Sequence, residues 1–277
     1  MTGTAVGATL AAAPATGDSG ELSVEAATVG PLPAEDMSPA PTSPRVDLKS
    51  VPDWGYLFRE IYEMYRHSSA GGSAKIRSHQ RSVREVLSKT LETNPELRFE
   101  QPESKPVCAH LKRALDEGRL ERTASVIRAI ESVEKQLCWR YGYDKMPKSL
   151  SAKFAYAEFM GPVGPAVTNK LILGLVLFAP RTTYPAHSHD GITESYFVLS
   201  GSVSENDDGV FAPGSLIFNP PGRNHRITTG DHEPSLLAYA WIGPEDKLRD
   251  QKMIFSRTRP APSNADAPKA TRRAKKS

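Results

Sequence analysis

The spacing of apolar residues changes once along this chain of 277 residues, and the change limits the folds that it can adopt. Between about residues 53 and 143, apolar side chains recur at the three- and four-residue intervals of one face of an α-helix. From about residue 154 they gather instead in short runs rich in β-branched and aromatic residues, which are typical of strands. The sequence therefore predicts a helical region followed by a mainly β region.

Four apolar runs in the second region are expected to form strands, and no helical segment separates them. They comprise residues 171–178, 194–199, 215–218 and 236–241. Gly, Pro, Asn and Asp occupy the stretches between them, as expected for turns. Several short strands joined by turns predict an antiparallel barrel or jelly roll.

The composition of the two ends differs from that of the middle. Residues 1–45 are rich in Ala, Gly, Ser, Thr and Pro, and the last stretch combines prolines with a cluster of Arg and Lys. Such segments bury little apolar surface, so we expect a disordered leader at 1–45 and a basic disordered tail at 251–277. Between them we expect a helical N-terminal region at 46–150 and a β-barrel at 151–250.

The net charge of +3 gives no reason to expect a nucleic-acid partner, and we expect a small-molecule ligand instead. A DNA-reading role for the helical region stays open because of one basic cluster, although such residues more often form the solvated face of a helix. The cluster consists of Lys75, Arg77, Arg81 and Arg84. A homo-oligomer remains one of the options for the assembly.

Several features favour a cytoplasmic location. No apolar stretch approaches the roughly 20 residues needed to cross a bilayer. The first basic residue is Arg45, so the charged start of a secretory signal is missing. Cys108 and Cys138 have neither the spacing of a zinc knuckle nor that of a disulfide framework, which is consistent with a reducing compartment.

Two sequence blocks carry side chains that bind metals. The first reads H-x-H-x4-E-x6-G and contains His187, His189 and Glu194. Residues i and i+2 of a strand share a face, so both histidines can point inward. The second reads G-x5-P-x-G-x2-H and ends at His225. Three imidazoles and one carboxylate suit Fe²⁺, Zn²⁺, Mn²⁺, Co²⁺ or Ni²⁺, with positions left open for substrate or water, so we expect one divalent transition metal here.

These two blocks resemble the paired motifs of the cupin superfamily, although Thr229 stands where an asparagine often follows the second motif. The resemblance implies a small jelly-roll β-barrel with all four ligands projecting into its mouth. The alternative is that the histidines are core groups without a metal, as in cupins that have lost it. Four such side chains would be costly to bury without a metal or hydrogen bonds.

Tyr196 follows Glu194 by two residues and should therefore face the same cavity. In small barrels an inward aromatic side chain is most often filler, so packing is one interpretation of this residue. Its position beside an expected ligand makes a chemical role the other.

Longer segments resemble the cupin-type dimethylsulfoniopropionate lyases, particularly the longer members with a helical N-terminal part. The similarity rests on residues 154–159, 173–187, 194–196 and 226–241, and it extends over roughly residues 53–245. Members of that family split dimethylsulfoniopropionate (DMSP) into dimethyl sulfide and acrylate. The resemblance implies that Tyr196 is the base beside the metal. A free tyrosine has a pKa of about 10, but a nearby dication and a sulfonium substrate both favour the phenolate.

The sulfonium group of such a substrate has no hydrogen-bond donor and is best held against aromatic faces. Candidates are Tyr184, Tyr239 and Trp241. Tyr239 and Trp241 share parity on one strand, but the sequence leaves open whether that face is the cavity or the packing side. Tyr184, three residues before the first ligand, is the favoured contact, with core packing as the alternative for each residue.

Two other functions stay open on these residues. An Fe(II) cupin dioxygenase would use the same ligand set to bind O₂ and an organic substrate together, and an anaerobic assay separates it from a lyase. A non-catalytic cupin regulator would sense a ligand through the barrel and act through the helices, and DNA binding by the helices would favour it.

Overall fold

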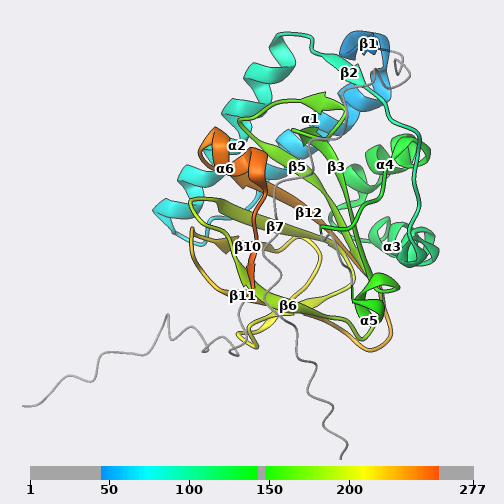
Figure 1. The fold of residues 1–277 in the computed structure, drawn as a ribbon, viewed down its shortest axis with the longest axis vertical. Coiled ribbons are helices and arrows are strands. Elements are labelled where there is room, and N and C mark those ends of the chain that lie inside the picture. The colour runs from blue at the N-terminus through cyan, green and yellow to red at the C-terminus, as the bar shows by residue number, and fades with distance from the viewer. Residues whose placement is uncertain (1–44, 143–146, 256–277) are drawn as a thin grey trace, which may run out of the picture.

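The computed structural model describes residues 45–142 and 147–255, and its N-terminal part is helical, as predicted (Figure 1). Pro52 opens the first helix at a position where its missing N–H costs nothing. The second helix is capped by the Ser73 hydroxyl, which accepts a hydrogen bond from the N–H of Ile76. The four helices of this region are α1 (Pro52–His67), α2 (Ala74–Glu92), α3 (Leu111–Gly118) and α4 (Ala124–Val133). Short 3₁₀ turns lie at Leu48–Ser50, Pro106–His110 and Glu134–Gln136.

The strands form two sheets. The larger has the order β1 (Arg45–Asp47), β2 (Glu96–Arg98), β4 (Ala166–Val167), β3 (Phe154–Gly161), β5 (Ile172–Phe178), β12 (Ser235–Ile242), β7 (Thr193–Ser200) and β10 (Leu216–Asn219). The smaller has the order β13 (Ile254–Phe255), β6 (Thr183–Ser188), β11 (His225–Thr229), β8 (Val203–Glu205) and β9 (Val210–Phe211). Short helices α5 (Lys148–Ser151) and α6 (Glu245–Asp250) precede β3 and β13. The four predicted strands correspond to β5, β7, β10 and β12, with ends that differ by at most one residue.

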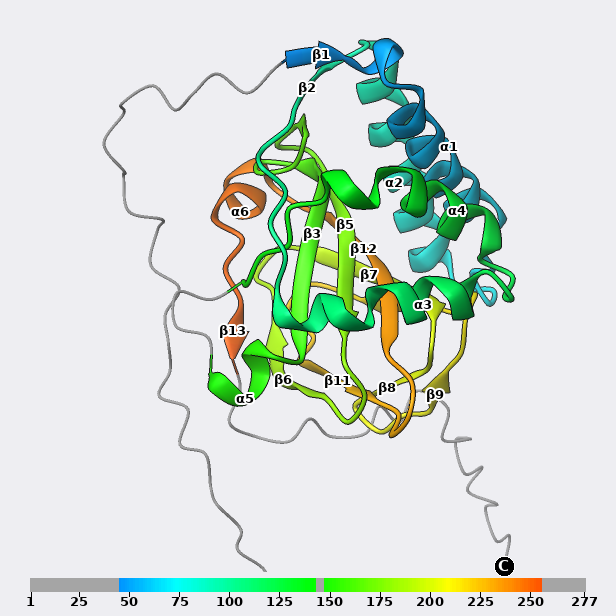
Figure 2. The same cartoon turned by 90° about the vertical axis from the view of Figure 1, so that its right-hand side faces the viewer.

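The larger sheet is covered on both faces (Figure 2). Helices α1–α4 pack against its outer face, and its inner face meets the smaller sheet. Strand β12 shows the division clearly, because Leu236, Ala238 and Ala240 pack toward the helices. Tyr239 and Trp241 point the other way, into the space between the sheets. Burial on both faces explains why these strands read as continuous apolar runs.

The jelly roll and the helical region before it are confirmed, with the strands arranged as two packed sheets rather than as one continuous closed barrel. The predicted leader, apart from its last residue, and the predicted tail from residue 256 onward lie outside the described residues. Within 251–255, strand β13 pairs with β6. Among the helices that the structure describes, none combines the length and the apolar character needed to span a membrane.

Candidate metal centre and substrate cavity

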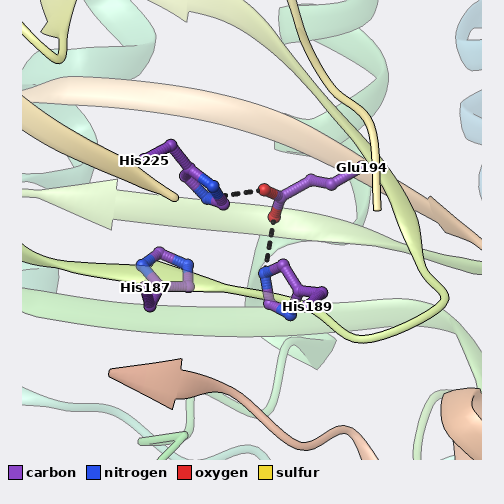
Figure 3. Close-up of side chains that lie close together, drawn as sticks. All are labelled: His187, His189, Glu194 and His225. Atoms are coloured by element: carbon purple, nitrogen blue, oxygen red, sulfur yellow. Dashed lines mark ion pairs between the residues drawn. The ribbon is translucent and has the colours of Figure 1, made fainter. Parts of the chain in front are cut away.

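Four side chains from three strands and the turn after β6 meet between the two sheets (Figure 3). His187 lies on β6, His189 directly after it, Glu194 on β7 and His225 on β11. Strands β6 and β11 are paired so that His225 stands opposite His187. One ligand atom from each residue lies within 4.8 Å of the others, and all four residues are buried. The structure thus brings together the full set that the sequence suggested.

Backbone carbonyls fix two of the imidazoles. The Nδ1–H group of His187 donates to the carbonyl of Pro185 over 3.0 Å, and that of His225 donates to the carbonyl of Arg223 over 3.1 Å. A carbonyl can only accept, so both rings carry their proton on Nδ1. In the neutral imidazole Nε2 is then left with a bare lone pair, which is the state in which histidine binds metals.

The Nε2 atom of His225 lies 2.8 Å from Oε2 of Glu194, and the two form an ion pair only when that imidazole is protonated. Nε2 of His189 has no hydrogen-bond partner among the described residues and lies 3.7 Å from Oε1 of the same carboxylate. When these imidazoles are neutral, their lone pairs face a buried carboxylate and need a cation between them. The cluster therefore fits a metal ion, and its three imidazoles and one carboxylate are the donors that divalent transition metals accept.

Glu194 is held by two further side chains. The indole N–H of Trp241 donates to Oε1 over 2.7 Å, and the amide of Asn219 approaches Oε2 at 3.4 Å. The same amide donates to the buried carboxylate of Glu205 over 3.0 Å. Burial opposes ionisation of Glu194, but the positive charge that the neighbouring imidazoles carry when protonated, that of His225 first, outweighs it and holds the pKa of the carboxyl well below its usual range. The group is a carboxylate at neutral pH.

A cavity of about 580 Å³ extends from this cluster and reaches Glu194 and His187. Tyr184, Tyr239 and Trp241, the three aromatic residues singled out in the sequence, all line it. The ring of Tyr184 lies 5.2 Å from that of His187, measured between centroids. The face of β12 that the sequence left open is thus the cavity face.

Tyr196 also lines the cavity, from the same strand face as Glu194. Burial and, after it, the Glu194 carboxylate raise the pKa of Tyr196 well above its ordinary value. The phenol is therefore neutral in the arrangement described, and a base role requires added positive charge.

Several cavity residues were missed by the sequence reasoning. Tyr156 shares strand parity with Phe154, and this alternation in β3 was a signal that could have found both. Lys105 at the cavity wall pairs with Glu103 and lies 4.8 Å from the centroid of the Tyr141 ring. No local sequence pattern marks Glu103, Lys105 or Tyr141, because only the tertiary fold brings them to the cavity.

Comparison with known proteins identifies the family of this chain. The model of the dimethylsulfoniopropionate lyase family matches residues 78–237. The chain is also 52% identical over 214 residues to the putative dimethylsulfoniopropionate lyase DddL of Cereibacter sphaeroides. The aligned part covers 77% of this chain and 92% of the relative. The chain belongs to the dimethylsulfoniopropionate lyase family, a family of enzymes.

Solved structures of DMSP lyases share the fold. DddQ from Ruegeria pomeroyi matches with a TM-score of 0.54 and 20% identity, over 70% of this chain and 92% of that one. A chain from crystal structures of the DMSP lyases RdDddP and RnDddQII matches with a TM-score of 0.53 and 21% identity, over 70% of this chain and 94% of that one. At such identities the likeness concerns the fold.

Proposed function

We propose that this DMSP lyase family enzyme cleaves dimethylsulfoniopropionate into dimethyl sulfide and acrylate by β-elimination, with one divalent transition metal and with Tyr196 as the base. The observation that carries the proposal is the common position of Glu194 and Tyr196 on one wall of an aromatic-lined cavity. The family match and the 52% identical relative support the substrate.

His187, His189, Glu194 and His225 would hold the metal, which the donor set limits to Fe²⁺, Zn²⁺, Mn²⁺, Co²⁺ or Ni²⁺. When bound, such an ion supplies a Lewis-acid charge that stabilises negative charge developing beside the substrate carboxylate. Trp241 and Asn219 orient the Glu194 carboxylate for this role.

Tyr196, as the phenolate, removes the proton on the carbon next to the carboxylate and becomes the neutral phenol. The electrons of that C–H bond form the double bond of acrylate, the C–S bond breaks, and its electron pair leaves on neutral dimethyl sulfide. No general acid is needed, because the leaving group departs uncharged. The sulfonium of the incoming substrate adds positive charge near the phenol and opposes the effect of burial on its pKa.

Three aromatic side chains at the cavity wall provide the faces that a sulfonium prefers. Tyr184, Tyr239 and Trp241 all reach the cavity, and each contact of a cation with such a ring contributes roughly 0.5–2 kcal/mol. We assign them to the sulfonium end of the substrate, with its carboxylate toward the histidine cluster.

An anaerobic assay tests the proposed reaction. Purified protein reconstituted with each of the five metals in turn is mixed with DMSP without oxygen, and dimethyl sulfide and acrylate are measured together. Equal amounts of both products are expected with at least one metal, because elimination consumes no oxidant. Product formation only after oxygen is admitted would favour the dioxygenase, and absence of turnover under every condition would contradict lyase activity.

A further inference from the structure

Three buried polar side chains meet on the face of β7 that points away from the cavity. The Ser195 hydroxyl lies 2.9 Å from the hydroxyl of Tyr65 on α1 and 2.8 Å from Nε2 of His79 on α2. All three residues are buried. The helical region thus reaches the strand of the site through hydrogen bonds as well as apolar contacts.

Ser195 stands between the two residues of β7 with the most direct roles in the proposed reaction. Because strand side chains alternate, Glu194 and Tyr196 point into the cavity while Ser195 points toward the helices. A shift of the backbone at Ser195 would therefore move both neighbours together. Among the described residues, the Ser195 hydroxyl is the group through which helices α1 and α2 form hydrogen bonds to the Glu194–Tyr196 segment of β7.

The hydrogen bonds of the cluster are mutually consistent. Burial lowers the pKa of His79 to about 4, so its imidazole is neutral at neutral pH. A serine hydroxyl can accept from one neighbour while it donates to the other, which satisfies Tyr65, Ser195 and His79 in one chain. The rings of His79 and Phe218 of β10 also pack edge to face, with centroids 5.6 Å apart. A fully satisfied buried network rigidifies the groups that it joins.

We propose that Ser195, clamped by Tyr65 and His79, is a positioning residue that fixes the orientation of Glu194 and Tyr196 in the cavity. The inference rests on the proposed function for the role of Tyr196, but not for the placement of Glu194. It assigns a purpose to the helical region: α1 and α2 set the geometry of the reaction from behind the sheet.

Two substitutions in the helices break the clamp without touching β7. His79→Leu removes the imidazole, and Tyr65→Phe removes only a hydroxyl and keeps the ring. His79→Gln serves as the rescue variant, because its amide can reach the position of Nε2. Thr123→Val is the matched control: the Thr123 hydroxyl makes a comparable buried hydrogen bond of 2.6 Å to the carbonyl of Leu199, farther along the same strand.

Each variant is measured as the full chain for melting temperature, for Co²⁺ dissociation followed by visible absorption, and for kcat and KM of dimethyl sulfide release. The clamp predicts that His79→Leu and Tyr65→Phe weaken Co²⁺ binding and lower kcat by roughly 10- to 100-fold, with little change in KM. His79→Gln should recover most of both losses. Thr123→Val should lower the melting temperature to a similar degree while Co²⁺ binding and kcat stay close to the parent values.

A proportional loss of kcat, Co²⁺ binding and melting temperature in all variants, the control included, would overturn the proposal, since the cluster would then only stabilise the fold. Tyr65→Phe keeps the test decisive where His79→Leu does not fold. If the parent protein releases no dimethyl sulfide, the proposed function fails, whereas the Co²⁺ comparison still decides whether the clamp positions Glu194.

Discussion

The indole N–H of Trp241 donates a 2.7 Å hydrogen bond to Oε1 of Glu194, its direct partner across the paired strands β12 and β7. The bond holds the carboxylate toward the histidines and leaves Oε2 beside His225. Trp241 thus orients a side chain of the candidate metal centre through its nitrogen and also lines the cavity.

Trp241→Phe separates these two contributions, because it keeps an aromatic face and removes the donor. We expect the metal dissociation constant to rise by roughly 10-fold, as is typical when a group that orients a ligand is lost. A chelator competition assay measures it. Tyr239→Phe, a change on the same face of the same strand, should leave metal affinity within about 2-fold, since Tyr239 makes no hydrogen bond to Glu194 among the described contacts. Equal effects of both changes would contradict the orienting role of the indole.

Removal of a histidine should empty the metal centre. The purified protein is expected to contain about one divalent transition metal per chain, and His187→Ala or His225→Ala should lower occupancy sharply because the ligands act on one ion. Elemental analysis gives the result directly. Full metal content in both variants would show that the metal is bound elsewhere.

The stability of the protein should depend on pH through Glu158 of β3. This buried carboxyl accepts hydrogen bonds from the N–H groups of Val163 and Gly164, but burial outweighs them and raises its pKa from 4.5 to about 7. The folded chain therefore holds this proton more tightly than the unfolded chain. The free energy of unfolding should fall as pH rises from about 4.5 to about 7, by about 3 kcal/mol, and should show no further change from this group above that range.

Glu158→Gln isolates this contribution, because the amide oxygen can still accept both backbone hydrogen bonds but carries no titrating proton. Urea unfolding of both proteins at a series of pH values, with metal removed from each, should give a flatter pH dependence for the variant. The same slope in both proteins would mean that Glu158 ionises without cost to the fold.

The alternation of side chains along strands, which can be read from the local sequence, predicted which residues of the candidate site face inward. The alternation rule placed His187, His189, Glu194 and Tyr196 on inward faces, and all four lie there because the register shifts of β6 and β7 fall outside the two-residue steps that join these pairs. The same rule could not orient Tyr239 and Trp241, since β12 is apolar on both faces and only the position of the helices distinguishes them.

Contacts between distant segments escaped the sequence reasoning. The hydrogen bonds of Ser195 reach 116 and 130 residues back to His79 and Tyr65, and nothing in the local sequence of any of the three marks the pairing. A buried serine in an apolar strand carries no signal of its partner. Such residues are found only when the packing of α1 and α2 on the sheet is known.

The claim that Tyr196 removes the substrate proton is tested most directly by the rate of dimethyl sulfide release from Tyr196→Phe. The change keeps the ring and its packing but removes the oxygen that accepts the proton. With metal content and melting temperature equal to those of the parent on the same preparation, release from DMSP should fall by at least about 100-fold, as expected for a lost general base. Release within a few-fold of the parent from this folded, metal-loaded variant would contradict the mechanism.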